Sequence, residues 1–254
     1  MVFIASHWTP DSSTAVRVFS NCEEVGLVLD GELLERRRPD ADRISTHLAH
    51  PPFTFQLRRL EPGTLEAIGY IAGTEAARHV VRTPGAVERL ELRLDESGRR
   101  FAAHGKDVAF LRAELKDAAG TIVPDAWENV FFGATGDITL LGVNPFSSEA
   151  GIASIFVQSE VMDPRGVVYA LCLARDGDRV HILSAAHSLR GEFDPVEVRA
   201  TTDGSDPGSG VIHRAGPVVG AGRVRAALYV DDRSILEADT DVPRFRIAGS
   251  TAPD

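Results

Sequence analysis

Apolar and polar residues alternate in short runs along most of the chain. Runs rich in Val, Ile, Leu, Phe and Thr recur at intervals of roughly 8 to 12 residues, and Gly, Pro, Asp and Asn separate them. This spacing of strands and turns is typical of β-sandwiches, so the sequence predicts an all-β fold. In residues 73–82 and 148–160, Ala and Glu favour a helix, which stays open there as the alternative.

Small residues at fixed places indicate where the chain turns back. Residues 16–34 form a hairpin candidate, because Asp30-Gly31 accepts the positive φ angles of a tight turn. Ala72-Gly73 separates two further apolar runs in the same way. We therefore expect consecutive antiparallel strands in this part of the chain.

Proline and glycine also indicate domain boundaries. Pro84-Gly85 interrupts the strand pattern and suggests an exit from the first domain. We predict three tandem β domains over residues 1–86, 87–190 and 191–254. The last of these is close to the smallest size that supports a core of its own, so we expect it to lean on its neighbour.

Charge and apolar content exclude several classes of partner. The chain has 27 Lys and Arg against 37 Asp and Glu, a formal net charge of −10 that repels nucleic-acid phosphates. The first residues lack the features of a signal peptide, and no apolar run approaches the ~20 residues of a membrane helix. We expect a soluble chain with no nucleic-acid or membrane partner and no defined localisation. Cys22 and Cys172 are expected to be buried thiols.

No motif for catalysis or metal binding stands out. The chain lacks a G-x-S-x-G elbow, and no two carboxylates are singled out as an acid and base pair. His47 with His50, and His181 with His187, have no third ligand nearby in the sequence. The oxygen-rich segment 201–209 fits a turn closed by aspartate side chains better than a calcium loop. The sequence therefore predicts no catalytic residue, no metal and no cofactor.

Aromatic residues offer the one candidate for ligand binding. Trp8 lies in a predicted loop beside His7, and Trp127 lies in a second loop. An exposed indole could stack on a sugar ring, whereas a buried one would only fill a core. His7, Trp8 and Trp127 are therefore candidate carbohydrate-binding residues.

Five motifs keep an order typical of one known family. They are SHWT (6–9), VRVFSNCEEVGLVLDGELL (16–34), HPPFTF (50–55), PGTLEAIGY (62–70) and ARHVVRTPG (77–85). Together they resemble the first immunoglobulin-like domain after the catalytic barrel in bacterial β-galactosidase-type members of glycoside hydrolase family 2. Residues 87–190 resemble the next immunoglobulin-like sandwich, and residues 191–254 resemble a small fibronectin-like domain at the end of some hexosaminidases.

The resemblance implies a role other than catalysis. In the family, the sugar-binding domain, the barrel and both catalytic glutamates precede the matched region, so no catalytic residue is carried over. The expected function is that of a non-catalytic accessory region that supports the barrel, the active-site entrance or oligomer contacts. The expected partners are the catalytic and sugar-binding domains of a parent glycosidase, with glycans and a homo-oligomer left open. An autonomous carbohydrate-binding module and, less favoured by the residues, an intrinsic hydrolase are the alternatives.

Overall fold

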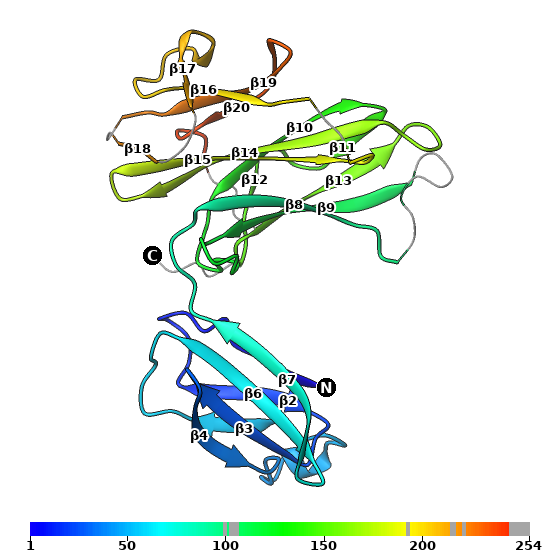
Figure 1. Cartoon of the computed structure of the whole chain (residues 1–254), viewed down its shortest axis with the longest axis vertical. Coiled ribbons are helices and arrows are strands. Elements are labelled where there is room, and N and C mark those ends of the chain that lie inside the picture. Colours follow the sequence, from blue (N-terminus) through cyan, green and yellow to red (C-terminus); the bar gives the residue numbers. More distant parts are fainter. Residues whose placement is uncertain (99–100, 102–106, 192–193, 214–216, 220–221, 244–254) are drawn as a thin grey trace. The chain divides into compact units, whose positions relative to one another are not determined.

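Strands dominate the computed structural model, which describes residues 1–98, 101, 107–191, 194–213, 217–219 and 222–243 (Figure 1). In these residues the only helices are two 3-10 turns, Ser45–His47 and Pro207–Ser209. The predicted all-β class is confirmed. The chain divides into two compact units, Met1–Pro84 and Gly85–Asp254.

The first unit is a sandwich of two antiparallel sheets. The smaller sheet has the order β1 (Val2–Ile4), β2 (Ala15–Ser20), β5 (Phe53–Gln56). The larger has the order β4 (Glu32–Arg37), β3 (Glu24–Leu29), β6 (Thr64–Ile71), β7 (Thr74–Arg82). Alternation along each strand sends one set of side chains into a common core, which includes Trp8, Val16, Leu27, Phe53, Phe55 and Leu65.

The turns of this unit follow the sequence signals. Asp30 and Gly31 have φ angles of 47° and 87°, and they close the hairpin of β3 and β4. Ala72 and Gly73 close β6 and β7 in the same way. The run 16–34 is divided, however, because β2 pairs with β1 and β5 and so lies in the other sheet. The helix alternative for residues 73–82 is wrong, since Thr74–Arg82 form β7.

The second unit contains three antiparallel sheets. One has the order β11 (Ile138–Leu141), β13 (Ile152–Ser159), β9 (Val108–Lys116), β8 (Arg89–Asp95). Another has the order β12 (Phe146–Ser147), β10 (Asn129–Gly136), β14 (Gly166–Asp176), β15 (Arg179–Ser188), β18 (Pro217–Val219). The third has the order β17 (Val211–His213), β16 (Glu197–Thr201), β19 (Arg225–Val230), β20 (Arg233–Asp239).

The sheet that contains β14 is the middle layer of the second unit. Along β14, Val168, Ala170 and Cys172 join the core shared with the sheet of β9. Their neighbours Tyr169 and Leu171 join the core shared with the sheet of β19. Burial of both faces explains why this strand is an almost unbroken apolar run instead of an alternating one.

Residues 197–239 supply the outer layer over the middle sheet and also one strand of it. β18 pairs with β15, while β16, β17, β19 and β20 form their own sheet. The expected dependence of this segment on its neighbour is seen in the shared core. A domain boundary near residue 190 stays a prediction.

Two other expectations can be compared with the second unit. Residues 152–159 form β13, so the helix alternative for segment 148–160 is wrong there. Cys172 and, in the first unit, Cys22 are both buried and free of disulfides, as predicted. None of the helices in the described part of the chain has the length and apolar character needed to cross a bilayer.

Candidate functional site

The three candidate carbohydrate-binding residues lie in different surroundings. His7 is exposed, Trp8 is only 2% exposed, and Trp127 is half-buried. His7 and Trp8 belong to the first unit and Trp127 to the second. Trp8 therefore offers no open ring face to a sugar, and carbohydrate binding through His7 and Trp127 stays a prediction.

Local hydrogen bonds turn Trp8 inward. Its φ angle is +54°, and its backbone N–H donates to Ser6 Oγ at 3.1 Å. The next N–H, of Thr9, donates to Ser12 Oγ at 2.9 Å, which closes the turn that follows Trp8. The indole packs in the core of the sandwich, where its Nε1 has no hydrogen-bond partner among the described residues. The loop prediction was correct, but the side chain serves the fold.

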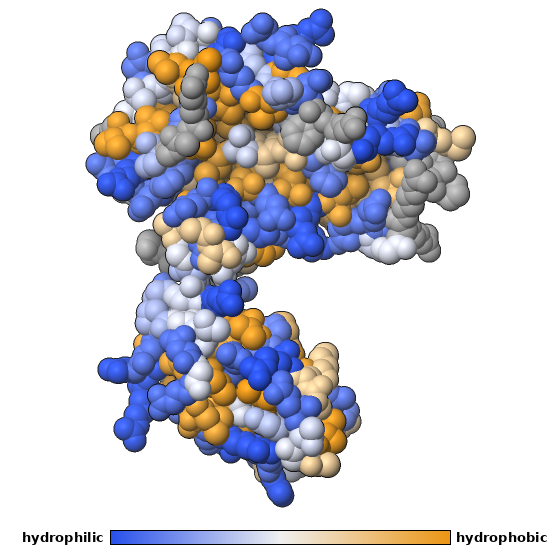
Figure 2. Space-filling model, in the orientation of Figure 1, coloured by the Kyte–Doolittle hydropathy of each residue, from blue (hydrophilic) through white to orange (hydrophobic). Residues whose placement is uncertain are grey.

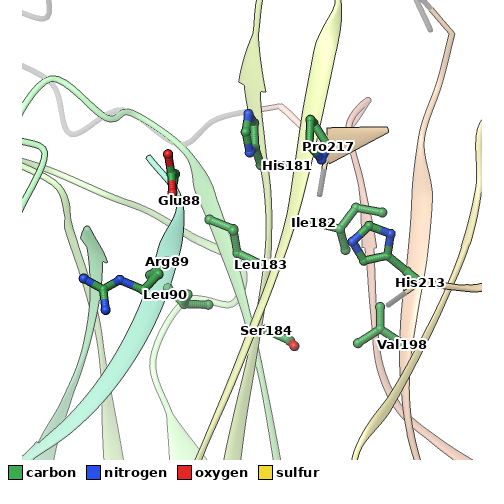
Figure 3. Close-up of a pocket in the computed structure, with 10 residues that line it drawn as sticks. All are labelled: Glu88, Arg89, Leu90, His181, Ile182, Leu183, Ser184, Val198, His213 and Pro217. Carbon is green, nitrogen blue, oxygen red and sulfur yellow. The ribbon is translucent and has the colours of Figure 1, made fainter. Parts of the chain in front are cut away.

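A hollow of about 610 Å³ lies along the edge of β15 in the second unit (Figure 3). β15 pairs with β18 only over residues 179–181, so beyond that point this edge has no strand partner in the part of the chain described. Leu90 and Leu183 lie on one side of β15, while Val198 and His213 lie beside Ile182 on the other (Figure 3). The hollow is thus bordered by all three sheets of this unit.

The polar groups of this hollow do not form a hydrolytic pair. Glu88 is the one carboxylate among the described residues that line it, whereas glycoside hydrolysis uses two. Burial lowers the pKa of His213, which keeps its imidazole neutral at pH 7. The Arg89 guanidinium donates to the carbonyl oxygens of Asp117 and Ala118 at 2.8 to 3.3 Å. The geometry suits binding better than acid and base catalysis.

A second hollow, of about 300 Å³, contains two carboxylates that are already engaged. Asp163 Oδ2 lies 2.6 Å from Arg190 Nη2. Glu96 Oε1 accepts a hydrogen bond from the backbone N–H of Phe101 at 2.9 Å. Burial lowers the pKa of His187, which lines the same hollow. Both carboxylates serve local structure.

The oxygen-rich segment 201–209 forms a turn. No group of three His, Cys, Asp or Glu side chains in the described residues is placed to hold a metal ion. In segment 201–209, Asp203 Oδ1 accepts from the Ser205 N–H at 2.9 Å, and Asp206 Oδ1 accepts from the Gly208 N–H at 2.8 Å. The prediction of a turn closed by aspartate side chains is confirmed.

The outer face of the sheet β1-β2-β5 carries exposed apolar side chains. Phe3 and Phe19 are cross-strand neighbours and are 50% and 42% exposed. Ile44 and Leu48, in the loop between β4 and β5, are also exposed and share with Arg17 and Phe19 the border of a hollow of about 950 Å³. We call the surface made by Phe3, Arg17, Phe19, Ile44 and Leu48 the phenylalanine face.

A shorter apolar row crosses the second unit. Leu141, Phe156 and Phe110 are successive cross-strand neighbours on β11, β13 and β9, and all three are exposed. The rings of Phe110 and Phe156 lie 4.2 Å apart between centroids. Apolar side chains at the surface are visible in both units in Figure 2.

The sequence analysis missed these apolar faces, although the alternation of strands contains the signal. In VRVFS, Val16 and Val18 point into the core, so Phe19 must point outward. The same reasoning applies to Phe110, which stands between the buried Ala109 and Leu111. A large apolar residue at an outward position is the feature to look for.

Comparison with known sequences identifies relatives of the chain. Residues 11–77 match a family described as a domain of unknown function, DUF4982. A β-galactosidase from Thermoanaerobacter pseudethanolicus is 34% identical over 171 residues, which covers 62% of this chain and 23% of that protein. A β-galactosidase from Bacteroides ovatus is 31% identical over 147 residues, which covers 56% of this chain and 16% of that protein. The chain therefore spans less than a quarter of the length of these relatives.

Comparison with solved structures identifies relatives of the same kind. A glycosyl hydrolase family 2 member from Bacteroides cellulosilyticus has 26% identity and a TM-score of 0.54, with 68% of this chain and 24% of that chain covered. A β-glucuronidase from glycoside hydrolase family 2 has 25% identity and a TM-score of 0.56, with 74% and 20% covered. The resemblance inferred from the sequence motifs is confirmed. In sequence and in fold, the chain is similar to the C-terminal β-sandwich region of β-galactosidase-type proteins of glycoside hydrolase family 2.

Proposed function

We propose that the chain acts as the non-catalytic accessory region of a β-galactosidase-type glycoside hydrolase. Its role is to support the catalytic barrel, the entrance of the active site or the contacts between subunits. The observation that carries this proposal is the 34% identity to a β-galactosidase of which the match covers only 23%. The remaining three quarters of such an enzyme would hold the catalytic and sugar-binding domains that this region assists.

The chemistry of the two hollows described in the second unit favours an accessory role over a catalytic one. One has a single carboxylate in its described lining, Glu88, and the other has Glu96 and Asp163, which are held by neighbouring groups. A glycosidase needs two carboxyl groups that face each other across the substrate. The apolar rows on outer sheet faces are instead a feature of surfaces that contact another protein.

The proposal is tested with a chimera. The matched segment of the Thermoanaerobacter pseudethanolicus β-galactosidase would be replaced by this chain, with a deletion of the segment as the comparison. We expect the chimera to hydrolyse nitrophenyl β-galactoside with higher thermal resistance than the deletion variant. The isolated chain should be inactive towards nitrophenyl galactoside and glucuronide. Turnover by the isolated chain, or a chimera no better than the deletion, would contradict the proposal.

Carbohydrate binding by the chain alone is the second candidate, and it depends on Trp127. The ring of Trp127 is half-buried, so part of it remains available, and the exposed His7 is the other residue in question. A calorimetric titration with β-galactosides, xyloglucan and pectic fragments tests it. Saturable binding that Trp127→Ala removes would support this function, and no heat at millimolar sugar would reject it.

A further inference from the structure

The hollow of about 950 Å³ in the first unit brings an aromatic ring together with charged and amide groups. Its volume falls within the range of about 300–1,000 Å³ that is usual for small-molecule sites. All residues of this unit belong to the described part of the chain, so its own lining is completely known. The side chains that matter are Arg17 and Phe19 on β2, Thr54 and Gln56 on β5, and Asp40 and Asp42 in the segment between β4 and β5.

Charge in this hollow is balanced. Its charged lining residues are two arginines, Arg17 and Arg37, and two aspartates, Asp40 and Asp42. Hydrogen bonds from Ser45 and its neighbour, together with the positive charge of Arg17, lower the pKa of Asp42. Arg37 donates to the carbonyl oxygen of Thr54. A ligand with a net charge would disturb this balance, so the hollow favours a neutral polar ligand.

The segment beside the hollow is held in place. Asp40 Oδ1 accepts from the Thr54 N–H at 3.1 Å, and its Oδ2 accepts from Thr54 Oγ1 at 2.5 Å. Asp42 Oδ1 accepts from the N–H groups of Ile44 and Ser45 at 2.8 and 2.9 Å. These bonds fix the segment against β5 before any ligand arrives. A fixed wall lowers the entropic cost of binding.

Some hydrogen-bonding capacity of the lining groups remains open. The Arg17 guanidinium donates no hydrogen bond to any residue that the structure describes. Gln56 Nε2 donates to Thr14 Oγ1 at 3.1 Å, which leaves its Oε1 as an acceptor. Asp42 Oδ2 accepts one hydrogen bond, from Ser45 Oγ at 2.7 Å, although a carboxylate oxygen can accept two. The hollow therefore offers donors at Arg17 and acceptors at Asp42 and Gln56.

Neighbouring hydroxyl groups on a sugar satisfy such a set. A guanidinium only donates and an ionised carboxylate only accepts, whereas a hydroxyl group does both. Phe19, which is 42% exposed, adds an apolar ring on which the C–H groups of a sugar can pack. An apolar surface with a few convergent polar groups is the usual composition of a small-molecule site. Together these groups favour a pyranose ring over an apolar peptide or an anion.

We propose that this hollow binds a neutral sugar ring, with Phe19 against the ring and with Arg17, Asp42 and Gln56 bonded to its hydroxyl groups. The inference rests on the proposed function, which assigns the chain to a β-galactosidase-type enzyme and so makes a β-galactoside the expected ligand. Its role would be to hold a segment of a longer glycan. This site differs from the candidate at Trp127, which belongs to the second unit.

The test is a titration of the isolated chain with methyl β-galactoside and with a β-galactosyl oligosaccharide. Backbone amide shifts from NMR spectra would report binding, and we expect saturable changes at Ile44, Ser45 and Thr54. These amides donate to the two aspartates of the hollow, so they report on this site directly. Methyl β-glucuronide carries the same kind of ring with a negative charge, and we expect it to bind no more tightly than the galactoside.

Two pairs of variants compare β2 with β7 in the opposite sheet. Phe19→Ser is matched by Val80→Ser, because the two side chains are 42% and 41% exposed. Arg17→Met is matched by Arg82→Met, since both arginines are exposed. We expect the two β2 variants to weaken binding roughly tenfold or more and the two β7 variants to change it less than about twofold. Circular dichroism would verify that each variant is folded.

Several outcomes would overturn the site. They are an absence of saturable shifts with every sugar, equal effects of Phe19→Ser and Val80→Ser, and tighter binding of the glucuronide. Binding that Trp127→Ala removes and Phe19→Ser preserves would reject the hollow in favour of the second unit. The chimera tests the proposed function separately. A chimera more heat-resistant than the deletion variant, together with no sugar binding by the isolated chain, would reject this inference alone.

Discussion

The two sheets of the first unit build one core with their inner faces and carry different side chains on their outer faces. Inside, both contribute fully buried side chains such as Leu27 and Phe55 to one core. Outside, one sheet carries Arg36 and Arg78 with their acidic partners beside exposed apolar residues such as Val80, and the other carries the exposed rings of Phe3 and Phe19. The fold accounts for the inner faces, and large apolar side chains stay exposed on both outer faces.

Individual ion pairs at the surface contribute little to stability. The difference between the faces is therefore a difference in solubility and contact more than in folding energy. Long arginine side chains place their methylene groups over apolar surface and keep their charge in water. Arg36 does this for Tyr70, while Arg17 lines the same hollow as Phe19 and Asp42 and helps to lower the pKa of the Asp42 carboxyl.

The largest expected effect comes from an inner position of the same small sheet. Phe55→Ala should lower the free energy of unfolding of the first unit by about 3–5 kcal/mol, because the ring is completely buried. Trp8→Ala should fall in the same range, so a loss of sugar binding in that variant would report unfolding. Urea titration followed by circular dichroism measures both. A cost below about 1 kcal/mol for Phe55→Ala would mean that the core does not depend on this sheet.

A smaller effect is expected on the outer face of the sheet β4-β3-β6-β7. Arg36→Ala removes the cation above Tyr70 and the partner of Glu24, and should cost about 0.5–1 kcal/mol. Arg36→Lys keeps the charge but loses the flat stacking surface, so it should lie between wild type and Arg36→Ala. The same urea titration distinguishes them. A fully neutral Arg36→Ala would show that the contacts of Arg36 with Tyr70 and Glu24 have no part in stability.

The outward positions should matter least to the isolated chain. Phe19→Ser and Val80→Ser should each change the free energy of unfolding by no more than about 0.5 kcal/mol, because both side chains are more than two fifths exposed. Thermal melts of the two variants side by side provide the measurement. A cost above about 1.5 kcal/mol for Phe19→Ser alone would show that the phenylalanine face is packed within this chain.

The most local prediction concerns the loop beside the phenylalanine face. Hydrogen bonds from the Ser45 backbone, the Ser45 hydroxyl and the Ile44 backbone hold the pKa of Asp42 below its ordinary value. The loop should therefore be fully ordered above about pH 4 and loosen as the pH falls through the lowered pKa. Amide chemical shifts of Ile44 and Ser45 would follow this change. Asp42→Asn keeps an acceptor oxygen without the titration, so its shifts should stay constant over the same range.

Strands and turns of this protein could be predicted because their signals are local. Asp30-Gly31 and Ala72-Gly73 adopt the positive φ angles that their residue types favour. Segments 73–82 and 148–160 contain helix-forming residues, yet most of their residues form β7 and β13 because pairing with neighbouring strands outweighs their weak intrinsic preference.

The pairing of strands and the direction of single side chains could not be predicted from local signals. β2 and β3 follow each other in the sequence but lie in different sheets, because the turn between them is not a hairpin turn. Trp8 looked like a loop residue available to a ligand, and a positive φ angle turns it into the core. The exposure of Phe19 depends on which face of β2 points to solvent. The packing of the two sheets determines that face.

The double-sided burial of β14 has a consequence for synthesis of the chain. Tyr169 and Leu171 are made long before Leu228 and Leu236, the residues of β19 and β20 that cover them. While the ribosome adds the intervening residues, one apolar face of the middle sheet is exposed. Exposed apolar surface promotes aggregation or chaperone binding. The C-terminal strands of the second unit are thus needed early in the life of the protein, whatever they later contact.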